Sequence, residues 1–268
     1  MSIKSDENMI LKVMKMFTEE RRQLISEMLS QKSSIKVSEI SELLNVSEST
    51  IRRDLKEMEE MGLLSRTHGG AVSFSVTNFE PTYNEKESSN QEEKNSIGKA
   101  AASMIKDGDT IVIDSGTTTL EIAKNITAKN ISVITNSIDI ASILCQKENV
   151  EVILTGGSLR PNTRAMVGQI AENAIRNFRV DKAFIGANGI SAEAGLTTPN
   201  YTEAQTKKAM IDIANKVIIA VDSTKFNRVN LAVISPVSEI TTIITSSAAD
   251  KKILNEYELL GIELKIAD

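Results

Sequence analysis

Residues 17–62 have hydrophobic positions spaced as in three successive helices. The first set of apolar side chains at helical spacing consists of Leu24, Ile25, Met28 and Leu29. A shorter stripe, interrupted by Asn45-Val46, consists of Ile40, Leu43 and Leu44. The third set lies between a capping serine, Ser47, and a terminating glycine, Gly62, and consists of Ile51, Leu55 and Met58. The pattern predicts one helix followed by two helices that are joined by a tight turn.

The helix predicted after Ser47 has a polar outer face. If its apolar residues face the core, the opposite surface carries Ser49, Thr50, Arg52, Arg53 and Lys56. Such a face fits the major groove of DNA, where hydroxyl and amino groups reach phosphates and arginines read guanine edges. We therefore predict that this helix reads DNA as part of a helix-turn-helix.

The run LLSRTHGGAVS that follows is typical of a strand, a glycine turn and a second strand. It predicts a wing, with Arg66 and His68 near its tip. The prediction is therefore a winged helix-turn-helix over residues 17–73, with double-stranded operator DNA as its partner. The residues predicted to contact DNA are Ser47, Ser49, Thr50, Arg52, Arg53, Lys56, Arg66 and His68.

The charge of this segment gives no independent support for DNA binding. Residues 17–73 contain eight Lys or Arg against ten Asp or Glu, and the formal net charge of the chain is -5. Any contact with nucleic acid must therefore come from a local cluster of basic residues. Short helix-turn-helix patterns also occur by chance, so the pattern alone leaves open a domain that does not bind DNA.

Residues 96–268 alternate short β-rich runs with apolar helical segments. The predicted strands include TIVID, ISVIT, VEVILT, KAFIGA, KVIIAV, TTIIT and IELKIA. This alternation predicts an α/β domain in which helices cover a mainly parallel sheet. The polar segment 74–95, which contains a proline, is predicted to be a linker, and residues 1–16 an N-terminal extension.

Several loops that follow the predicted strands combine small, hydroxyl-bearing and basic residues. In open parallel sheets, ligands bind beyond the carboxyl ends of the strands, where helix N-termini favour anions. Residues 115–119 provide hydroxyls and a glycine, residues 156–160 provide two glycines and a guanidinium, and residues 222–225 end on a lysine. Turn preferences alone explain any one of these loops. Their expected convergence on one sheet edge favours an anion site.

Composition excludes several classes of protein. The chain has no apolar run long enough to cross a bilayer and no signal-peptide cleavage site, which favours a cytoplasmic protein without membrane contact. The single histidine, His68, leaves no base for a Ser/His/Asp triad and no histidine-rich metal site, so we expect no catalytic residues and no metal. Neither a G-x-G-x-x-G fingerprint nor a P-loop lysine is present, so we expect no nucleotide cofactor. The single cysteine, Cys145, is expected to be buried on the apolar face of a helix.

The segment VSESTIRRDLKEMEEMGLLSRTHGGAV closely resembles the DNA-binding module of the DeoR family of bacterial sugar-metabolism repressors. The resemblance implies that Thr50, Arg52 and Arg53 lie on the recognition helix. It continues through DSGTTT, TGGSLR, DKAFIGANGI, EAQTKKAMI and DSTKF, which resemble landmarks of the sensor domain of the same family. Residues before Phe17 fall outside the resemblance, and Met16 is a candidate start.

The sensor domain of that family is similar in fold to ribose-5-phosphate isomerase, glucosamine-6-phosphate deaminase and CoA transferases. The resemblance therefore implies a pocket for a phosphorylated sugar. By matching positions, the implied lining residues are Asp114, Ser115, Gly116, Thr117, Thr118, Gly156, Gly157, Arg160, Gly186, Asn188, Glu203 and Lys225. The chain departs from the family at Ser246, where many members have an acidic residue, and at Asn227, where many have glycine. These departures leave the identity of the ligand open.

Three functions are compatible with these features. The leading hypothesis is a repressor, acting as a homodimer or homotetramer, that leaves its operator when a phosphorylated sugar binds. The second is an active isomerase or deaminase, with Asp114 or Glu203 as general base and Lys207 or Lys225 stabilising charge. The third is an activator, or a repressor that needs its ligand as corepressor, because the sequence does not set the sign of regulation.

Overall fold

The computed structural model describes residues 18–29, 34–61, 63–67, 69–72 and 83–268. The predicted extension 1–16, Gly62 and His68 lie outside these residues. The chain forms two compact units, Met1–Phe79 and Glu80–Asp268, which we call the first and second unit. Within the described ranges, no helix combines the length and the apolar character needed to span a bilayer.

The first unit has the predicted helix-turn-helix and wing. Its described elements are a helix over residues 18–29, β1 (Ser34–Lys36), α2 (Val37–Leu44), α3 (Glu48–Glu60), β2 (Ser65–Thr67) and β3 (Gly70–Val72). The strands pair antiparallel in the order β1-β3-β2. Strand β1 was not predicted, because three residues are too few to show an alternating pattern.

The turn between α2 and α3 is set by two polar residues. Asn45 ends α2 with a φ of 50°, a left-handed conformation that asparagine tolerates well. Ser47 caps α3 by accepting a hydrogen bond from the Thr50 amide at 3.3 Å. The apolar side chains of both helices then meet in one core, which contains Ile25, Leu29, Ile35, Val37, Ile40, Ile51, Leu55, Met58, Leu64 and Ala71.

The second unit is the predicted α/β domain. Its seven-stranded sheet is parallel throughout, in the order β15-β14-β12-β9-β4-β5-β6. The strands are β4 (Thr110–Ile113), β5 (Ile131–Thr135), β6 (Val150–Leu154), β9 (Val180–Ile185), β12 (Ala214–Ala220), β14 (Thr242–Ser246) and β15 (Glu263–Ala267). All but the two outermost strands have neighbours on both edges, and their near-continuous apolar runs suit a sheet that is covered on both faces.

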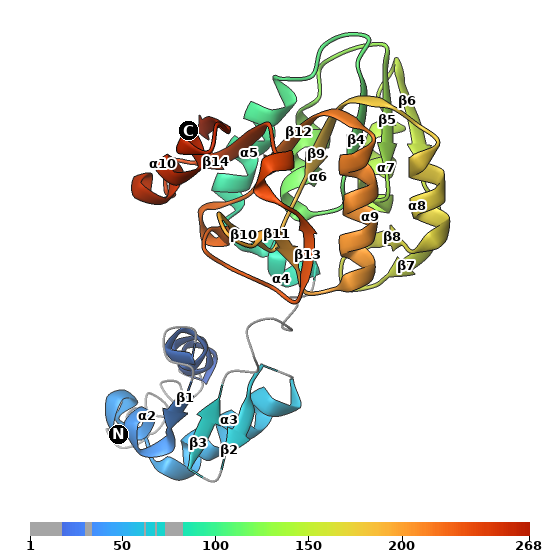
Figure 1. Cartoon of the computed structure of the whole chain (residues 1–268). Coiled ribbons are helices and arrows are strands. Elements are labelled where there is room, and N and C mark those ends of the chain that lie inside the picture. Colours follow the sequence, from blue (N-terminus) through green and yellow to red (C-terminus); the bar gives the residue numbers. More distant parts are fainter. Residues whose placement is uncertain (1–17, 30–33, 62, 68, 73–82) are drawn as a thin grey trace, which may run out of the picture. The chain divides into compact units, whose positions relative to one another are not determined.

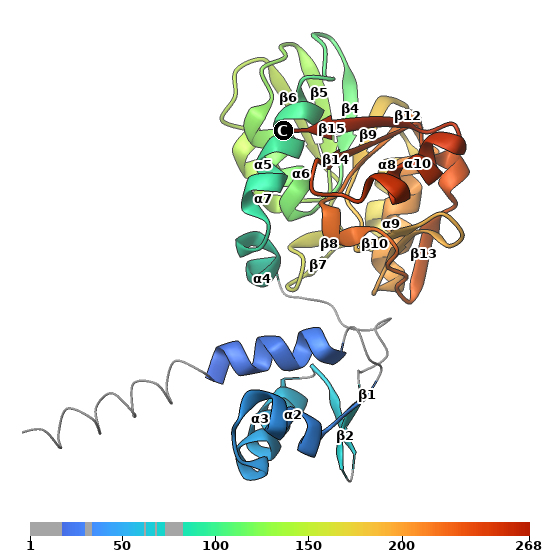
Figure 2. The same cartoon turned by 90° about the vertical axis from the view of Figure 1, so that its left-hand side faces the viewer.

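Helices cover both faces of this sheet (Figures 1 and 2). One face packs against α5 (Gln91–Ala102), α6 (Thr117–Asn125) and α7 (Ile138–Leu144). The other packs against α8 (Gln169–Arg176), α9 (Tyr201–Asp212) and α10 (Lys251–Leu259). The remaining elements are α4 (Tyr83–Ser88), the hairpin strands β7 (Ser158–Arg160) and β8 (Ala165–Val167), a small sheet of β10 (Gly189–Ser191), β11 (Gly195–Thr198) and β13 (Ala232–Ser235), and the 3-10 turns η1 (Ser223–Lys225) and η2 (Val237–Glu239).

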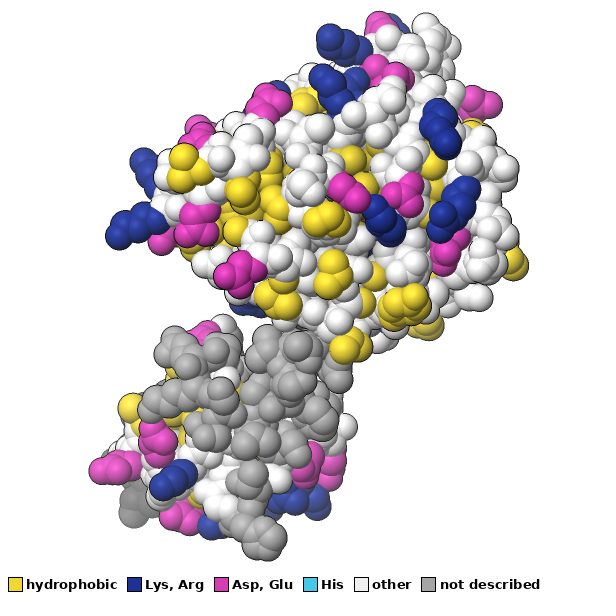
Figure 3. All heavy atoms as spheres, viewed as in Figure 1, with side chains coloured by type: hydrophobic (Ala, Val, Ile, Leu, Met, Phe, Trp, Pro, Cys, Tyr) yellow, Lys and Arg dark blue, Asp and Glu magenta, His cyan; other side chains and the backbone are white. Residues whose placement is uncertain are grey.

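The small antiparallel sheet has an apolar outer surface. Its strand order is β10-β11-β13, so β13 lies at an edge. Figure 3 shows hydrophobic side chains gathered over this part of the second unit. Along and before β13, the side chains of Val229, Leu231 and Val233 are 44%, 60% and 56% exposed, whereas Ala232 and Ile234 face the core. This edge is therefore a surface on which apolar side chains meet solvent.

The predicted linker 74–95 ends earlier than expected. Residues 83–95 form α4 and the start of α5 instead of a connector. Tyr83 is buried against the apolar cluster of α5, α6 and α7. Lys94, which is only 2% exposed, donates hydrogen bonds to the carbonyls of Lys86 and Ser89. The polar composition of this segment predicted a linker, but the buried Lys94 ammonium binds the carbonyl groups at the end of α4 and so stabilises the helix.

Cys145 was expected to be buried, and that prediction is wrong. Its side chain is exposed. The buried face of α7 is formed by Ile140 and Leu144, which lie one turn apart. Cys145 follows Leu144 as the C-cap, so it points away from that face.

Candidate functional site

The predicted DNA-reading face is present on α3. Arg52, Arg53 and Lys56 are exposed, while Ile51 and Leu55 on the same helix are buried. At the start of the helix, three hydroxyl side chains lie together. Ser47 Oγ is 2.8 Å from the hydroxyl of Ser49 and 2.9 Å from the hydroxyl of Thr50. This arrangement gives the helix N-terminus several hydrogen-bonding groups that suit phosphate oxygens.

The basic side chains of this face are paired to different extents. Arg52 forms an ion pair of 3.1 Å with Glu48, and Lys56 a looser one of 3.9 Å with Glu60. Both pairs are exposed, so DNA phosphates can replace the carboxylates at small cost. Arg53 has no ion pair among the described residues, so it is the arginine of this helix that is most readily available to DNA.

The wing arginine is held by an acid at the end of α3. Glu59 accepts hydrogen bonds from the backbone amide and from Nε of Arg66, both at 2.8 Å. The bond from the Arg66 amide, followed by the bond from its side chain, lowers the pKa of Glu59 below its ordinary value. These contacts fix the base of the wing on α3. The predicted partner at the wing tip, His68, lies outside the described residues.

A buried ion pair lies beneath the same helix. Arg21, on the helix over residues 18–29, donates to both carboxylate oxygens of Asp54 at 2.7 Å and 3.2 Å. Asp54 is 2% exposed and Arg21 8% exposed. A second ion pair, between Arg22 and Glu57, joins the same two helices. The sequence did not predict the Arg21–Asp54 pair, because the sequence alone does not distinguish a buried aspartate from an exposed one.

In the second unit, the carboxyl end of β4 leads into the N-terminus of α6. Gly116 is the N-cap and makes no side-chain capping bond. The first intrahelical bond runs from the Leu120 amide to the Gly116 carbonyl, at 2.9 Å. The amides of residues 117–119 therefore have no acceptor within the helix, and such a terminus favours an anion. Ser115, by contrast, is used internally, because its amide donates to the Asn136 side chain at 2.9 Å.

Asp114 lies at this strand end with no exposed surface. Its Oδ2 accepts hydrogen bonds from Lys207 Nζ and from the Gly186 amide, the latter at 3.1 Å. Its Oδ1 is buried and has no hydrogen-bond partner among the described residues. Burial raises the pKa of Asp114 above its ordinary value, although the Lys207 ammonium opposes the shift. Oδ1 is thus a buried acceptor whose hydrogen-bonding capacity is not used by the described residues.

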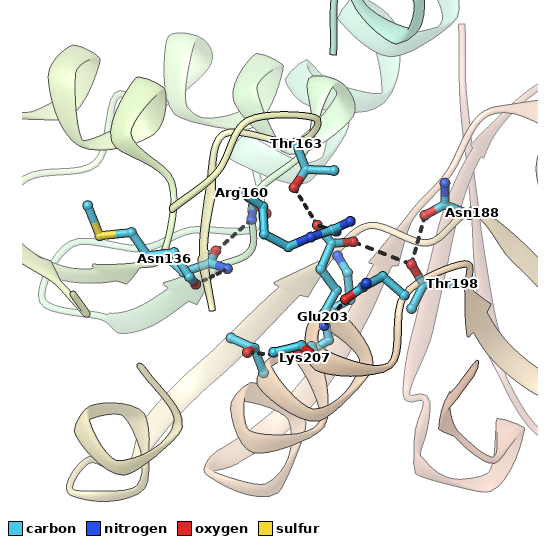
Figure 4. A network of polar contacts seen from close by, with 12 residues as sticks. Asn136, Arg160, Thr163, Asn188, Thr198, Glu203 and Lys207 are labelled. Atoms are coloured by element: carbon cyan, nitrogen blue, oxygen red, sulfur yellow. Dashed lines mark hydrogen bonds and ion pairs between the residues drawn. The ribbon is translucent and has the colours of Figure 1, made fainter. Parts of the chain in front are cut away.

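Glu203 lies one helical turn before Lys207 on α9 and gathers a second set of contacts (Figure 4). Arg160 Nη1 lies 2.7 Å from its carboxylate, and the hydroxyls of Thr163 and Thr198 donate to it. Burial acts to raise the pKa of Glu203, but Lys207, Thr163 and Arg160 outweigh it, so the pKa is lower than usual. The carboxylate is therefore held in its charged form.

These contacts form one group around Asp114 and one around Glu203, and the charge of Lys207 acts on both carboxylates. We call the two groups together the Asp114–Glu203 network. Its members are Asp114, Arg160, Thr163, Gly186, Asn188, Thr198, Glu203 and Lys207. Asn188 belongs to it because its side-chain oxygen accepts a bond from Thr198 at 3.2 Å. Lys207, Thr163 and Thr198 were not among the predicted lining residues. The spacing of Glu203 and Lys207, four residues apart on a helix, was the signal that places both on one face.

The two predicted glycines shape the backbone that leads to Arg160. Gly156 and Gly157 have φ values of 68° and 114°, which favour glycine. A Cβ at Gly157 would lie 2.7 Å from the carbonyl oxygen of Val167. These residues thus set the path of the chain into β7.

Lys225, another predicted lining residue, makes no hydrogen bond or ion pair with a member of the network among the described residues. Its Nζ is 3.4 Å from Asp222 Oδ2 and 3.2 Å from the Thr224 hydroxyl. The adjacent Ser223 and Asp222 contact Glu93 and Asn90, at the start of α5. The described contacts of Lys225 are therefore local. The nearby Asn227 has a φ of 55°, a left-handed conformation that glycine adopts more readily than other residues.

Other kinds of site find less support. Among the described residues, no group of three or more His, Cys, Asp or Glu side chains is arranged to hold a metal ion. An open hollow of about 420 Å³ lies at the amino ends of β5 and β6, at the opposite edge of the sheet from the network. It is lined by Asn130, Ile131, Ser132, Asn149, Val150 and Glu151, so it has a single charged group. The network is the better candidate because charged groups converge there.

Comparisons with known proteins agree with both halves of the chain. The sequence profile of the DeoR-like helix-turn-helix domain matches residues 21–77, and that of the DeoR C terminal sensor domain matches residues 89–247. The HTH-type transcriptional regulator GlpR of Haloferax volcanii is 38% identical over 248 residues, which cover 92% of this chain and 97% of the relative. The putative aga operon transcriptional repressor of Escherichia coli O157:H7 is 36% identical over 251 residues, which cover 92% and 93%. Among solved structures, ribose 5-phosphate isomerase A from Methanocaldococcus jannaschii aligns with 52% of this chain and 55% of its own, at 19% identity and a TM-score of 0.37.

Proposed function

Because the chain belongs to the DeoR family of helix-turn-helix transcriptional regulators, we propose that it represses a carbohydrate-metabolism operon and is released by a phosphorylated sugar or sugar derivative. The first unit binds double-stranded operator DNA through α3 and the wing. The second unit binds the effector. The two sites are linked because the effector binds the DNA-bound and released states with different affinities.

The observation that carries the effector assignment is the uncapped start of α6 beside a buried, incompletely paired carboxylate. The phosphate of the effector accepts hydrogen bonds from the amides of residues 117–119 and from the hydroxyls of Thr117 and Thr118. A sugar hydroxyl donates to Asp114 Oδ1, which has no partner among the described residues. Arg160, which is paired with Glu203 in this structure, supplies a positively charged side chain that can bind the phosphate in addition to the helix N-terminus.

The DNA assignment depends on the exposed face of α3. Arg53 and Arg52 read base edges, and the hydroxyls around Ser47 contact phosphates. A single helix-turn-helix reads a short site, so specific binding requires two or four copies on paired half-sites. The exposed apolar side chains of Leu231, just before the edge strand β13, and of Val233, within it, support contact between copies.

The first experiment is a thermal-shift screen of the full chain. The probes are ribose 5-phosphate, fructose 1-phosphate, fructose 6-phosphate, glucose 6-phosphate and glucosamine 6-phosphate, each paired with its unphosphorylated sugar. A ligand of the native state raises the unfolding temperature. We expect one phosphorylated compound to stabilise the chain, its free sugar to have no effect, and Thr117→Ala to lose the response. Equal stabilisation by the free sugar would contradict a phosphate site.

The second experiment places DNA and effector in one assay. Promoter fragments from the neighbourhood of the gene are titrated with the chain at several salt concentrations, with and without the stabilising compound. We expect sequence-preferring binding that the compound weakens. Binding with no sequence preference at any salt concentration would refute the repressor assignment, and stronger binding in the presence of the compound would make the compound a corepressor.

Catalysis by the second unit has weaker physical support. A general base must accept a proton, whereas the Asp114 carboxylate is paired with the Lys207 ammonium, which makes it a weaker base than it would be unpaired. We therefore propose that the network binds and does not turn over its ligand. Turnover of a sugar phosphate that disappears in Asp114→Asn would contradict this.

A further inference from the structure

The β7–β8 hairpin makes two sets of contacts through residues 160–164. We call Arg160 and Thr163 its inner end and Arg164 its outer end. On one side, Arg160 and Thr163 bind the carboxylate of Glu203, in the Asp114–Glu203 network. On the other side, the next residue, Arg164, reaches α4. Its guanidinium carbon lies 4.4 Å from the centre of the Tyr83 ring, and its Nη2 donates to the Asn84 side chain at 3.4 Å. A segment of five residues therefore touches both the network and the first helix of the second unit.

The tip of this hairpin is held in an unusual conformation. Arg164 has a φ of 52°, in the left-handed region that residues with a Cβ adopt rarely. Its amide donates to the Arg160 carbonyl at 2.8 Å, which closes the turn. Arg164 Nη1 also lies 3.5 Å from Asp139, on α7. The backbone of Arg164 is thus tied directly to that of Arg160 across the turn.

The position of α4 in the chain gives this contact its significance. Tyr83 is the first described residue after the segment that joins the two units in sequence. The Tyr83 ring is 5% exposed and lies between the Arg164 guanidinium and the apolar cluster of α5 to α7. A cation over an aromatic face is an attractive contact whose strength depends on position. A shift of the hairpin thus alters how α4 is held.

We propose that the β7–β8 hairpin carries the effector signal from the Asp114–Glu203 network to α4, and that Arg164 is the positioning residue at its outer end. This inference rests on the proposed function, because it needs an anionic effector at the network. The phosphate competes with the Glu203 carboxylate for Arg160, and this competition releases the inner end of the hairpin. Coupling of this kind needs one element whose equilibrium both sites bias.

The first test compares Arg164→Ala with the control Arg176→Ala in the full chain. Arg176 is an exposed arginine on α8 that pairs with Glu172 of the same helix, so its loss removes a charge but no contact to α4. The readout is the ratio of operator dissociation constants with and without the sugar phosphate that stabilises the parent chain. In regulators this ratio is typically about 5 to 150.

We expect Arg164→Ala to bind the operator and the sugar phosphate as the parent does, but with a ratio that falls to about 1. The Arg176→Ala control keeps the parental ratio. A parental ratio in Arg164→Ala overturns the inference. If the parent itself gives no ratio, the proposed function fails instead, and the following test still decides the role of the hairpin.

The second test needs no effector. Glu203→Gln removes the charge that holds Arg160, so the hairpin loosens and amide hydrogen exchange in residues 83–88 becomes several-fold faster. In the Arg164→Ala background α4 is already disconnected, so adding Glu203→Gln changes exchange in residues 83–88 no further. Non-additivity of this kind measures the coupling of the two ends. Unchanged exchange in Glu203→Gln, or the same increase in both backgrounds, overturns the inference.

Discussion

Replacing Asp54 by alanine should unfold much of the first unit, because it leaves the guanidinium of Arg21 buried without its partner. The two oxygens of Asp54 accept from Arg21 at 2.7 Å and 3.2 Å, and both side chains are almost fully buried. Asp54 lies on the buried side of α3, opposite the residues proposed to read DNA. The substitution therefore acts on the support of the recognition helix and leaves its outer face intact.

The expected effect is comparable with the whole stability of the unit. Removing one partner of a buried ion pair costs about 3–5 kcal/mol, because the remaining charge loses its compensation. A domain of roughly 60 residues is stabilised by about 3–9 kcal/mol in total. Asp54→Ala should therefore bring the free energy of unfolding of the first unit close to zero. Operator binding falls because few chains have a folded α3.

Calorimetry of the full chain should resolve this effect, because the two units can unfold separately. We expect Asp54→Ala to lower or abolish the transition of the first unit while the second unit keeps its own. The double variant Arg21→Met/Asp54→Leu removes both charges together and should recover most of the stability, because a buried ion pair can be replaced by apolar residues of similar volume. Arg52→Ala, which breaks an exposed pair, should change the stability by less than about 1 kcal/mol.

One result would refute this reasoning. If Asp54→Ala lowers the free energy of unfolding of the first unit by less than about 1 kcal/mol, the pair is solvated in the native state and does not support α3. Hydrogen exchange of the α3 amides in the same sample would then also match that of the parent.

Four further outcomes follow from the site geometry. Arg53→Ala and Arg52→Ala should each weaken operator binding by about 1–3 kcal/mol in a titration, while calorimetric binding of the sugar phosphate stays unchanged; parental operator affinity in both would contradict the contact face. Thr117→Ala should bind the operator but resist release, because it loses a hydroxyl contact to the phosphate at the start of α6. A gel-shift assay with the stabilising sugar phosphate measures this, and normal release would count against the placement of the pocket. The pKa of Glu203 is lowered in the folded protein. The stability that its charged form contributes is therefore present above about pH 4.3 and is lost as the pH falls through the lower folded-state pKa. Melting temperatures of Glu203→Gln should fall less on acidification than those of the parent. Gly157→Ala should destabilise the second unit by at least about 1 kcal/mol in thermal unfolding, because of its positive φ and the 2.7 Å approach to a carbonyl, and an unchanged melting temperature would refute this.

The fold was predictable where pattern and spacing carry the information. Parallel strands that are buried on both faces have continuous apolar runs, and KVIIAV and TTIIT are β12 and β14 in the structure. The same holds for α3, whose cap and apolar spacing are local properties. By contrast, β1 is too short to show an alternating pattern. The segment of α4 was predicted to be a linker because its contacts with the buried Lys94 form only in the folded chain.

The site was predictable only in part, because burial and pairing depend on the assembled fold. The sequence pointed to the strand end at Asp114, but not to the hydroxyl of Thr163, which reaches Glu203 from a hairpin forty residues away. Lys225 was expected in the same pocket because it also follows a strand. Its side chain contacts Asp222 and Thr224 in the turn that follows β12, so its place in the pocket stays a prediction.

The exposed position of Cys145 makes the chain unusually easy to label. It is the single cysteine of the sequence and lies at the end of α7, on the surface of the second unit. A maleimide spin label or fluorophore will therefore attach at one known point in each copy without any engineered substitution. In a symmetric dimer the labels give one distance, and in a tetramer they give more than one, so a distance measurement counts the subunits. The chain also has no tryptophan, so a single introduced indole will report on its own surroundings without background.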